Sequence, residues 1–311
     1  MIQMDVLIVG SLAYDSLATP AGSVENELGG SASYGGFSAA FHNNKDFGSG
    51  VGIVGVVGQD FNNEHLEWYK SAGLDITGIE VNQGKTFRWK GSYHGSMAEA
   101  VTHETHLNVF EKFQPKVPQP LKNPEVLMCA NLHPSLQSSV ISQTNVGRVT
   151  MLDSMNLWIE IANEELKGVM KKVDILILND GEVRMLAKKE NLMDAAKDVL
   201  EMKNGGILVI KKGENGVIAF HPDGIISIPS FPTSNLVDPT GCGDSFAGSM
   251  AHYLSRNSGR VSREELAESL VHATVTASFT IENFGTERIR KLSVQEYESR
   301  LLEYRSITKT A

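Results

Sequence analysis

A carboxylate stands directly after a glycine-rich loop in the segment Asp-Pro-Thr-Gly-Cys-Gly-Asp, residues 238–244. The apolar, small-residue run that follows predicts a helix beginning near Gly243. The amides of Gly241, Cys242 and Gly243 would then lie at a helix N-terminus, where they have no partners within the helix and carry the positive end of its dipole. Such a pocket binds anions, including a transferring phosphoryl group, and Asp244 would lie beside it. The alternative is a plain loop whose first-turn Asp stabilises the helix dipole.

Strands and helices alternate along most of the chain. Short apolar runs begin at residues 5, 51, 125, 149, 173 and 205 and do not alternate with polar residues, as expected of parallel strands covered on both faces. Helical patterns lie between them, with Asp60 and Ser135 placed as N-caps. Together these patterns predict an α/β fold with a mostly parallel sheet and helices on both faces. Residues 84–110 break the alternation and predict a polar, aromatic-rich hairpin that forms an edge flap or lid.

Composition excludes several other classes of protein. The 311 residues carry a net charge of -9, which disfavours contact with a nucleic-acid backbone, so no nucleic-acid partner is expected. No 18 apolar residues run together and the first residues lack a basic leader, so neither a membrane span nor a signal peptide is expected. Cys129 and Cys242 form neither a disulfide framework nor a zinc pattern, which is typical of a reducing compartment. We therefore expect a cytoplasmic protein.

The segment 238–244 resembles the C-terminal signature Asp-Thr-x-Gly-Ala-Gly-Asp of the phosphofructokinase-B or ribokinase-like family of carbohydrate and nucleoside kinases, with Cys242 in place of Ala. Other stretches match in the same order over nearly the whole length. The resemblance implies one domain over residues 1–311: a ribokinase-like three-layer α/β/α sandwich with a mostly parallel central sheet. It also implies a small β lid formed by about residues 12–30 and 84–114, and a homodimer paired through that lid.

The acceptor side of the family's site matches residues near the N-terminus. Asp15 follows the first strand, where the family's aspartate accepts hydrogen bonds from sugar hydroxyls; a loop-capping Asp is the alternative. Gly29 and Gly30 match the family's glycine pair, whose missing side chains let a polyol approach the backbone. Tyr34 stands where the family usually has Asn, and its ring could stack on a nucleobase or a sugar face.

The nucleotide side matches two further motifs. Asn179 and Glu182 reproduce the family's Asn-x-x-Glu, whose Glu holds magnesium waters near the phosphates; by itself this spacing is a helix-capping pattern. Lys211, Gly213 and Gly216 match the family's glycine-rich nucleotide loop, although a hairpin turn explains them equally well.

The remaining matches concern the adenine side, the phosphates and a cation. Thr274 aligns loosely with the adenine-side helix. The segment that follows Leu152 keeps Asp153 but lacks the family's Arg, so a basic contact to the nucleotide would come from Lys211 or Lys212. The resemblance also implies a monovalent cation such as potassium near Asp238.

Histidines in the lid segment suggest a zinc site at first sight. His103 and His106, with His94 nearby, have a metal-like spacing, but on a strand His103 and His106 would face opposite sides of the sheet. We therefore predict surface histidines.

These residues together indicate an ATP-dependent phosphotransferase that uses magnesium and phosphorylates an alcohol of a sugar or sugar derivative. Asp244, ionised at its ordinary pKa of about 3.9, would accept the hydroxyl proton. The alternative acceptor is a nucleoside, of the adenosine or cytidine type. A sugar or nucleotide sensor without catalytic activity is a third hypothesis, which the joint presence of Asp244, Asn179 and Glu182 disfavours.

Overall fold

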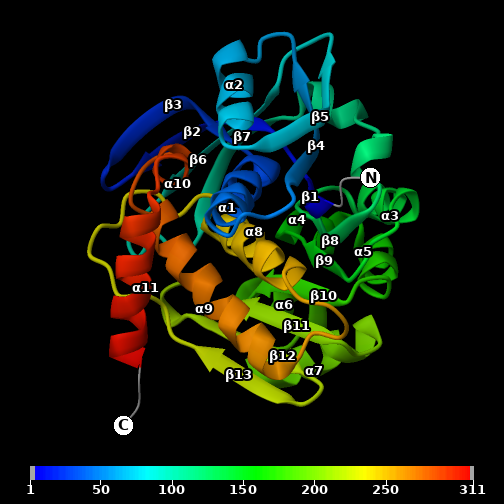
Figure 1. Ribbon diagram of the computed structural model, residues 1–311, viewed down its shortest axis with the longest axis vertical. Helices are drawn as coiled ribbons and strands as arrows, with labels where there is room; N and C mark the ends of the chain where they lie inside the picture. The colour runs from blue at the N-terminus through cyan, green and yellow to red at the C-terminus, as the bar shows by residue number, and fades with distance from the viewer. Residues whose placement is uncertain (1–3, 309–311) are drawn as a thin grey trace.

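A twisted sheet of nine strands runs through the molecule in the computed structural model, which describes residues 4–308 (Figure 1). The strand order is β13-β12-β11-β10-β9-β8-β1-β4-β5, and the strands from β11 to β5 pair in parallel, whereas β12 and β13 are antiparallel. Their bounds are β1 Met4–Val9, β4 Val51–Gly58, β5 Leu74–Asn82, β8 Pro124–Cys129, β9 Val149–Asp153, β10 Ile175–Asn179, β11 Ile207–Lys211, β12 Val217–His221 and β13 Gly224–Ile228.

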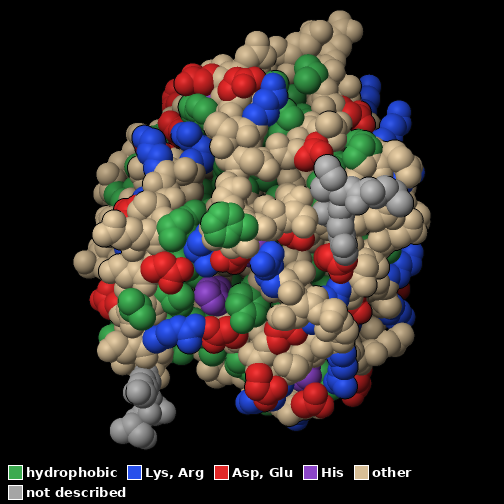
Figure 2. Space-filling view, in the orientation of Figure 1, with side chains coloured by type: hydrophobic (Ala, Val, Ile, Leu, Met, Phe, Trp, Pro, Cys, Tyr) green, Lys and Arg blue, Asp and Glu red, His purple; other side chains and the backbone are tan. Residues whose placement is uncertain are grey.

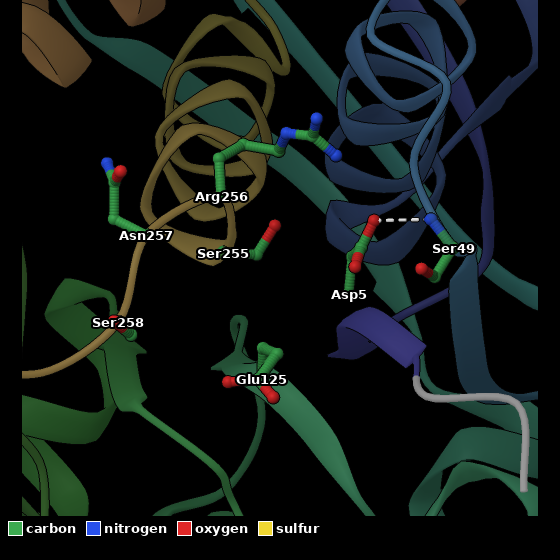
Figure 3. A pocket seen from close by; sticks show the side chains of 7 residues that line it. All are labelled: Asp5, Ser49, Glu125, Ser255, Arg256, Asn257 and Ser258. Atoms are coloured by element: carbon green, nitrogen blue, oxygen red, sulfur yellow. Dashed lines mark hydrogen bonds between the residues drawn. The ribbon is translucent and has the colours of Figure 1, made fainter.

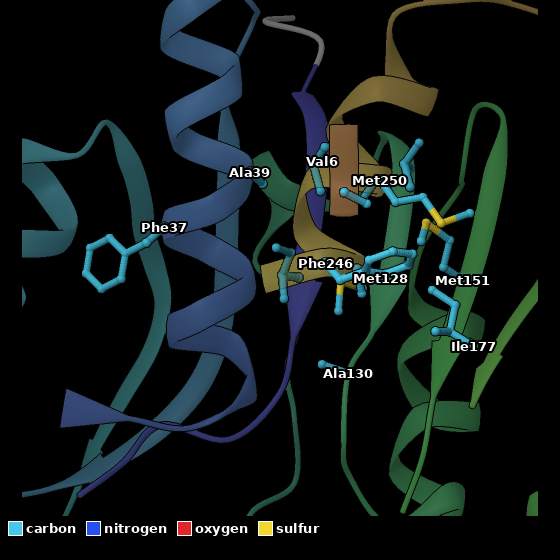
Figure 4. Packing of buried hydrophobic residues seen from close by; sticks show 14 of the residues in the cluster. Val6, Phe37, Ala39, Met128, Ala130, Met151, Ile177, Phe246 and Met250 are labelled. Atoms are coloured by element: carbon cyan, nitrogen blue, oxygen red, sulfur yellow. The ribbon is translucent and has the colours of Figure 1, made fainter. Parts of the chain in front are cut away.

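Helices cover both faces of this sheet because its strands are apolar on both sides. In β1, Val6 lies in the core beneath the α1, α8 and α9 layer (Figure 4), as does Ile8. Leu7 and Val9 pack toward α3, α5 and α7 on the other face. The first layer contains α1 Ser31–Lys45, α2 Asn63–Ser71, α8 Cys242–Ser255, α9 Arg263–Thr280, α10 Glu287–Arg290 and α11 Val294–Thr308. The second contains α3 Pro134–Gln143, α4 Asn156–Ile161, α5 Asn163–Met170, α6 Asp180–Ala187 and α7 Leu192–Lys203. The predicted three-layer α/β/α sandwich is confirmed.

The two predicted helix caps are each displaced by two residues. Asn62, not Asp60, caps α2 by accepting the amide of Glu64 at 2.9 Å, and the Asp60 carboxylate instead accepts the amide of Thr86 at 2.7 Å. His133, not Ser135, caps α3, because its ring nitrogen accepts the Ser135 amide at 3.2 Å. In both helices the side chain that reaches the free amides belongs to the residue just before the first helical turn.

A second, smaller sheet forms the lid. Its order is β3-β2-β6-β7, with β2 Ala13–Thr19, β3 Gly22–Gly29, β6 Phe87–Tyr93 and β7 Ala100–His106. The β6–β7 hairpin predicted from residues 84–110 is present, and β2 and β6 join the two hairpins in parallel. All seven residues of β7 are exposed.

The lid histidines lie on the surface, as predicted. His94 and His103 are exposed and both hydrogen-bond the hydroxyl of Ser92, at 2.9 and 2.8 Å, while His106 pairs with Glu104. No metal-binding group of three or more His, Cys, Asp or Glu is found among residues 4–308. Acidic and basic side chains are interspersed on the face shown in Figure 2. Within the same residues no helix combines the length and apolarity needed to span a membrane.

Helices α1 and α8 touch through their backbones. A Cβ added at Gly248 of α8 would lie 2.2 Å from the carbonyl oxygen of Gly35 in α1, so no larger residue fits there. The Ser38 hydroxyl donates to the carbonyl of Ser245 at 2.6 Å, which adds a buried hydrogen bond across the same contact. The N-terminal ends of both helices are therefore fixed relative to each other.

Candidate active site

Polar side chains gather where the parallel strands end. Asp153, Asn179 and Lys211 are the last residues of β9, β10 and β11. Ligands of open α/β sheets bind at this carboxyl edge, because the loops that follow the strands carry side chains free of the sheet. The loop before α8 adds the catalytic segment predicted from the sequence.

That segment opens α8 with two available amides. Gly241 is the N-cap in a left-handed conformation (φ 75°), and the helix begins at Cys242, one residue before the predicted position. The amides of Gly241 and Gly243 have no acceptor within residues 4–308, whereas the amide of Cys242 donates to the carbonyl of Pro239 at 3.2 Å. The predicted anion pocket of three amides is therefore corrected to two.

Asp238 holds this loop in place. Its side chain is completely buried, and its two carboxylate oxygens accept the amides of Thr240 at 2.9 Å and Gly285 at 3.3 Å. Burial raises the pKa of Asp238, and the two amides oppose that rise. The structure thus gives Asp238 a structural role that the sequence did not predict.

Asp244 lies beside the pocket and is half-buried. Burial raises its pKa to about 7, the carboxylate of Asp153 adds to the rise, and the Lys211 ammonium opposes it. The sequence led us to expect an ordinary pKa near 3.9. The difference arises because the carboxylates of Asp153 and Asp244, which lie far apart in the chain, meet in one poorly hydrated place.

Lys211 provides the positive charge of this cluster. Its ammonium lies 2.9 Å from an Asp153 carboxylate oxygen, and a Cβ added at Gly243 would lie 3.0 Å from the same nitrogen. Burial alone would lower the pKa of Lys211, but the carboxylates of Asp153 and Glu182 raise it. A protonated amine therefore lies next to Gly243 and its free amide, and both groups would stabilise an anion bound there.

Asn179 and Glu182 form a reciprocal capping box at the start of α6. The Asn179 amide donates to Glu182 at 2.7 Å, and the Glu182 amide donates to the Asn179 side chain at 2.7 Å. Burial raises the pKa of Glu182 to about 7, and Lys211 lowers it. The capping pattern that the sequence left open is therefore present, and the magnesium role of Glu182 stays a prediction.

Asp15 lies on β2 and is 5% exposed. Burial raises its pKa to about 8, and the carboxylates of Asp238 and Asp244 add to the rise. A Cβ at Gly29 would lie 1.9 Å from an Asp15 carboxylate oxygen, and a Cβ at Gly30 would lie 2.5 Å from the Ser11 carbonyl oxygen. The missing side chains thus make room for the protein's own groups, where the sequence suggested room for a polyol.

Tyr34 does not offer its ring to a ligand. The residue is 1% exposed, and a Cβ at Gly241 would lie 2.3 Å from its ring carbons, so the backbone of Gly241 covers the ring. The stacking on a nucleobase or sugar predicted for Tyr34 is therefore wrong for this conformation. Its hydroxyl is buried and has no hydrogen-bond partner within residues 4–308.

Tyr93 is a site residue that the sequence reading missed. It ends the lid strand β6, and its hydroxyl accepts a hydrogen bond from the Thr240 side chain at 3.2 Å. Burial raises the pKa of Tyr93, as do the carboxylates of Asp238 and Asp15. The lid therefore contacts the catalytic loop directly. Only the alternation of aromatic residues along 87–93 hinted that one face of this strand packs inward.

Three predicted nucleotide contacts lie outside this cluster. Gly213 and Gly216 form the turn between β11 and β12, where the Gly216 amide donates to the Gly213 carbonyl at 3.0 Å. Thr274 is 8% exposed within α9 and makes no hydrogen bond to the cluster in the described part of the chain. The hairpin turn, which was the alternative explanation for Gly213 and Gly216, is therefore present. Contact of Gly213, Gly216 and Thr274 with a nucleotide stays a prediction.

Cys242 gives a prediction of its own. Burial raises the pKa of its thiol, as do the carboxylates of Asp238 and Asp244, so the sulfur stays protonated and is a poor nucleophile. Its amide is already bonded to Pro239. We expect Cys242→Ala to retain kcat/KM within about threefold, measured as ADP release, because neither group faces the phosphoryl path. A tenfold loss would show that the sulfur contributes.

The carboxyl-edge cluster, the helix N-terminus and the lid define an α/β phosphotransferase for small molecules. The family model described as pfkB family carbohydrate kinase matches residues 3–291. The chain belongs to this family, and it is a kinase.

Relatives and solved structures agree with this assignment. A cytidine kinase from Thermococcus kodakarensis is 29% identical over 259 residues, which cover 81% of this chain and 89% of the relative. A nucleoside kinase from Methanocaldococcus jannaschii is 23% identical and covers 78% of this chain and 77% of the relative. Among solved structures, a putative ribokinase II from E. coli in complex with ATP and Mg²⁺ superposes with a TM-score of 0.77 at 18% identity, over 96% of this chain and 99% of that one.

Proposed function

We propose that this kinase transfers the γ-phosphoryl group of ATP to a hydroxyl of a nucleoside, with a free sugar as the competing acceptor. The single observation that carries the transfer is the half-buried carboxylate of Asp244 beside the free amides of Gly241 and Gly243 and the Lys211 ammonium. The 29% identical cytidine kinase favours the nucleoside. The family description, carbohydrate kinase, keeps the sugar as the second candidate.

Asp244 acts as the general base in this proposal. Its carboxylate accepts the proton of the acceptor hydroxyl as that oxygen forms a bond to the γ-phosphorus and the bond to the ADP oxygen breaks. Proton removal comes late in a loose phosphoryl-transfer transition state, so a base with a pKa near 7 suffices at neutral pH. The amides of Gly241 and Gly243 hold the transferring oxygens, an effect worth roughly 2.7–4 kcal/mol per donor in comparable sites.

Lys211 and Glu182 serve the nucleotide. When the phosphates of ATP bind, the Lys211 ammonium can replace its ion pair with Asp153 by one with a phosphate oxygen, because both partners are anionic. A magnesium ion is usually bound by only one or two protein carboxylates and keeps most of its water ligands. Glu182 fits a water-mediated contact, because only one of its carboxylate oxygens accepts a protein amide. Bound magnesium would neutralise phosphate charge; a potassium ion near Asp238 is not needed for this scheme.

Asp15 and the lid serve the acceptor. Asp15 accepts acceptor hydroxyls, and the Tyr93 contact to Thr240 lets the lid shut the site against water, which competes as a nucleophile. The fully exposed strand β7 forms one edge of the lid sheet, and this free edge supports pairing of two lids in a homodimer. Light scattering would reveal such a dimer as twice the 33.9 kDa mass of the chain. Two free cysteines support a reducing compartment such as the cytoplasm.

The test is ADP release by the purified protein with ATP and magnesium against a panel of nucleosides and sugars. We expect acceptor-dependent ADP release that is fastest with a nucleoside, and a phosphorylated product that mass spectrometry identifies. Fastest turnover with a sugar would replace the nucleoside by the second candidate. Binding of ATP and acceptor without turnover would favour the sensor hypothesis.

A further inference from the structure

Two cavities open at the edge of the sheet opposite the candidate active site, where the parallel strands begin. The larger, of about 440 Å³, lies near the start of β1 and β8 (Figure 3). Its lining combines the carboxylates of Asp5 and Glu125 with the guanidinium of Arg256, and Asp5 accepts the Ser49 amide at 2.6 Å. This mixture of charges favours neither an anion nor a cation.

The second cavity, of about 290 Å³, has a basic lining in an acidic protein. It lies between the starts of β9, β10 and β11, the end of α7 and the loop that joins α8 to α9. Four cationic residues and one carboxylate line it: Arg148, Lys171, Lys203, Arg260 and Asp174. Arg148 is neutralised by two 2.7 Å contacts to Glu265, which leaves three cations to act on a ligand.

Lys203 is a buried amine in this cavity's lining. The residue is 4% exposed, and its ammonium donates to the carbonyls of Val173 at 2.7 Å and Gly205 at 3.0 Å. An ammonium has three hydrogens, and among residues 4–308 the Lys203 ammonium has only these two acceptors and no carboxylate within 4.0 Å. Burial lowers the pKa of Lys203 to about 8, with Asp174 opposing, as expected of a buried amine that lacks a close counter-ion.

Further donors surround the opening. Lys171 is exposed and has no ion pair within the described residues, and Arg260 is exposed with only a 3.6 Å contact to Asp223. The amide of Gly206 has no acceptor in the described chain, and a Cβ at Gly206 would lie 2.6 Å from the Lys203 ammonium. An ammonium, a backbone amide and two exposed cationic side chains therefore line one small cavity.

We infer that this cavity binds a small oxyanion, either inorganic phosphate or the phosphoryl group of a small metabolite, with Lys203 at its base and Lys171 and Arg260 at its rim. A buried cation is costly unless it is paired, and an oxyanion supplies both the missing counter-charge and the acceptor for the third N–H. The two carbonyls satisfy hydrogen bonds of Lys203, and the Asp174 carboxylate, which makes no ion pair with it, compensates its charge only in part. The inference does not depend on the proposed kinase reaction, because none of these residues lies at the carboxyl edge.

The experiment compares three proteins by thermal unfolding at pH 7. They are the wild type, the rim variant Lys171→Ala/Arg260→Ala, and the control variant Lys112→Ala/Lys116→Ala, which removes two exposed cations elsewhere. Each is heated in sodium phosphate, in a sugar phosphate and in sodium chloride of equal ionic strength. At ten times Kd a single site raises the Tm of a chain this long by about 2 °C.

We expect phosphate to raise the Tm of the wild type and the control variant equally, and to raise that of the rim variant by less than half as much. The residual rise in the rim variant reports phosphate at the catalytic amides, which all three proteins share. A sugar phosphate more effective than inorganic phosphate would identify a metabolite as the source. Equal rises in all three proteins overturn the inference.

Isothermal titration with phosphate provides a second measurement. The wild type and the control variant should bind one more equivalent than the rim variant. Lys203→Met, if circular dichroism shows that it folds, should lose the same equivalent. Equal stoichiometry in the wild type and the rim variant also overturns the inference, whatever becomes of Lys203→Met.

Discussion

Asp244→Asn is expected to lower kcat by at least about a hundredfold, the scale of losing a general base. The amide has the shape of the carboxylate but cannot take the acceptor proton. Since Lys211 and the amides of Gly241 and Gly243 remain, the dissociation constant for ATP should change by less than about threefold. Turnover measured as ADP release and nucleotide binding measured by calorimetry would separate these two effects.

Asp194→Asn is the matched control for this substitution, because Asp194 is exposed in the first turn of α7, away from the cluster. It should keep wild-type turnover. Retention of more than a tenth of wild-type kcat by Asp244→Asn would remove Asp244 from the role of base.

The pH profile adds a further signature of Asp244. Because the pKa of Asp244 in the free enzyme is about 7, wild-type kcat/KM should climb between pH 6 and 8. The apparent pKa read from this profile belongs to the coupled carboxylates of Asp244 and Asp15 and not to one residue.

Asp15→Asn is expected to lower kcat/KM for the acceptor by at least about a hundredfold and, at the same time, to stabilise the protein at pH 8. The functional loss, measured above pH 8 where the carboxyl group is ionised, follows because an amide offers one acceptor oxygen where the carboxylate offers two, so acceptor hydroxyls go unpaired. KM for ATP should change by less than about threefold.

The stability gain follows from the sign of the pKa shift. The pKa of Asp15 is raised to about 8 in the folded state, so its contribution is intact below pH 4 and is lost as pH rises toward 8. An Asn at this position does not ionise and avoids that loss, which amounts to up to about 5 kcal/mol at 1.36 kcal/mol per unit. Thermal unfolding should show a Tm for Asp15→Asn that exceeds the wild type by at least about 3 °C at pH 8, with the difference shrinking by pH 5.

A Tm difference that is the same at pH 5 and pH 8 would contradict this assignment of the buried charge. Asp194→Asn again serves as the control and should show no pH-dependent difference, because its side chain is solvated in both states. A variant that is stabilised but fully active would place the acceptor site elsewhere.

The central strands could be predicted because their residues are apolar on both faces. Every residue of β1 and β4 is buried, and both were predicted from unbroken apolar runs. Strand β5, at the edge of the sheet, is half-exposed, and its mixed polar and apolar residues were not among the apolar runs that predicted strands. Strands β2 and β3 were expected only through the resemblance, as the 12–30 part of the β lid, because most of β3 faces solvent and its sequence carries no apolar pattern.

The carboxylates that gather at the carboxyl edge could be identified from the sequence, but not their electrostatics. Asp15, Glu182 and Asp244 were each identified from local motifs, yet their raised pKa values come from burial by segments that are distant in the chain. The contact of Gly29 with Asp15 could not be predicted for the same reason. Its missing side chain accommodates the carboxylate of Asp15, and that contact exists only after β2 and β3 pair.

The backbone contact between Gly35 and Gly248 has a consequence for how such an enzyme diversifies. It joins the helix that follows the acceptor-side glycines to the helix that carries Asp244, so these two parts move as one body. Mutations can accumulate in the exposed strand β7 without touching this contact, whereas β6 reaches the loop before α8 through the hydrogen bond between Tyr93 and Thr240. Descendants of this chain could therefore vary β7 freely, while any exchange at Gly248 would be removed by selection.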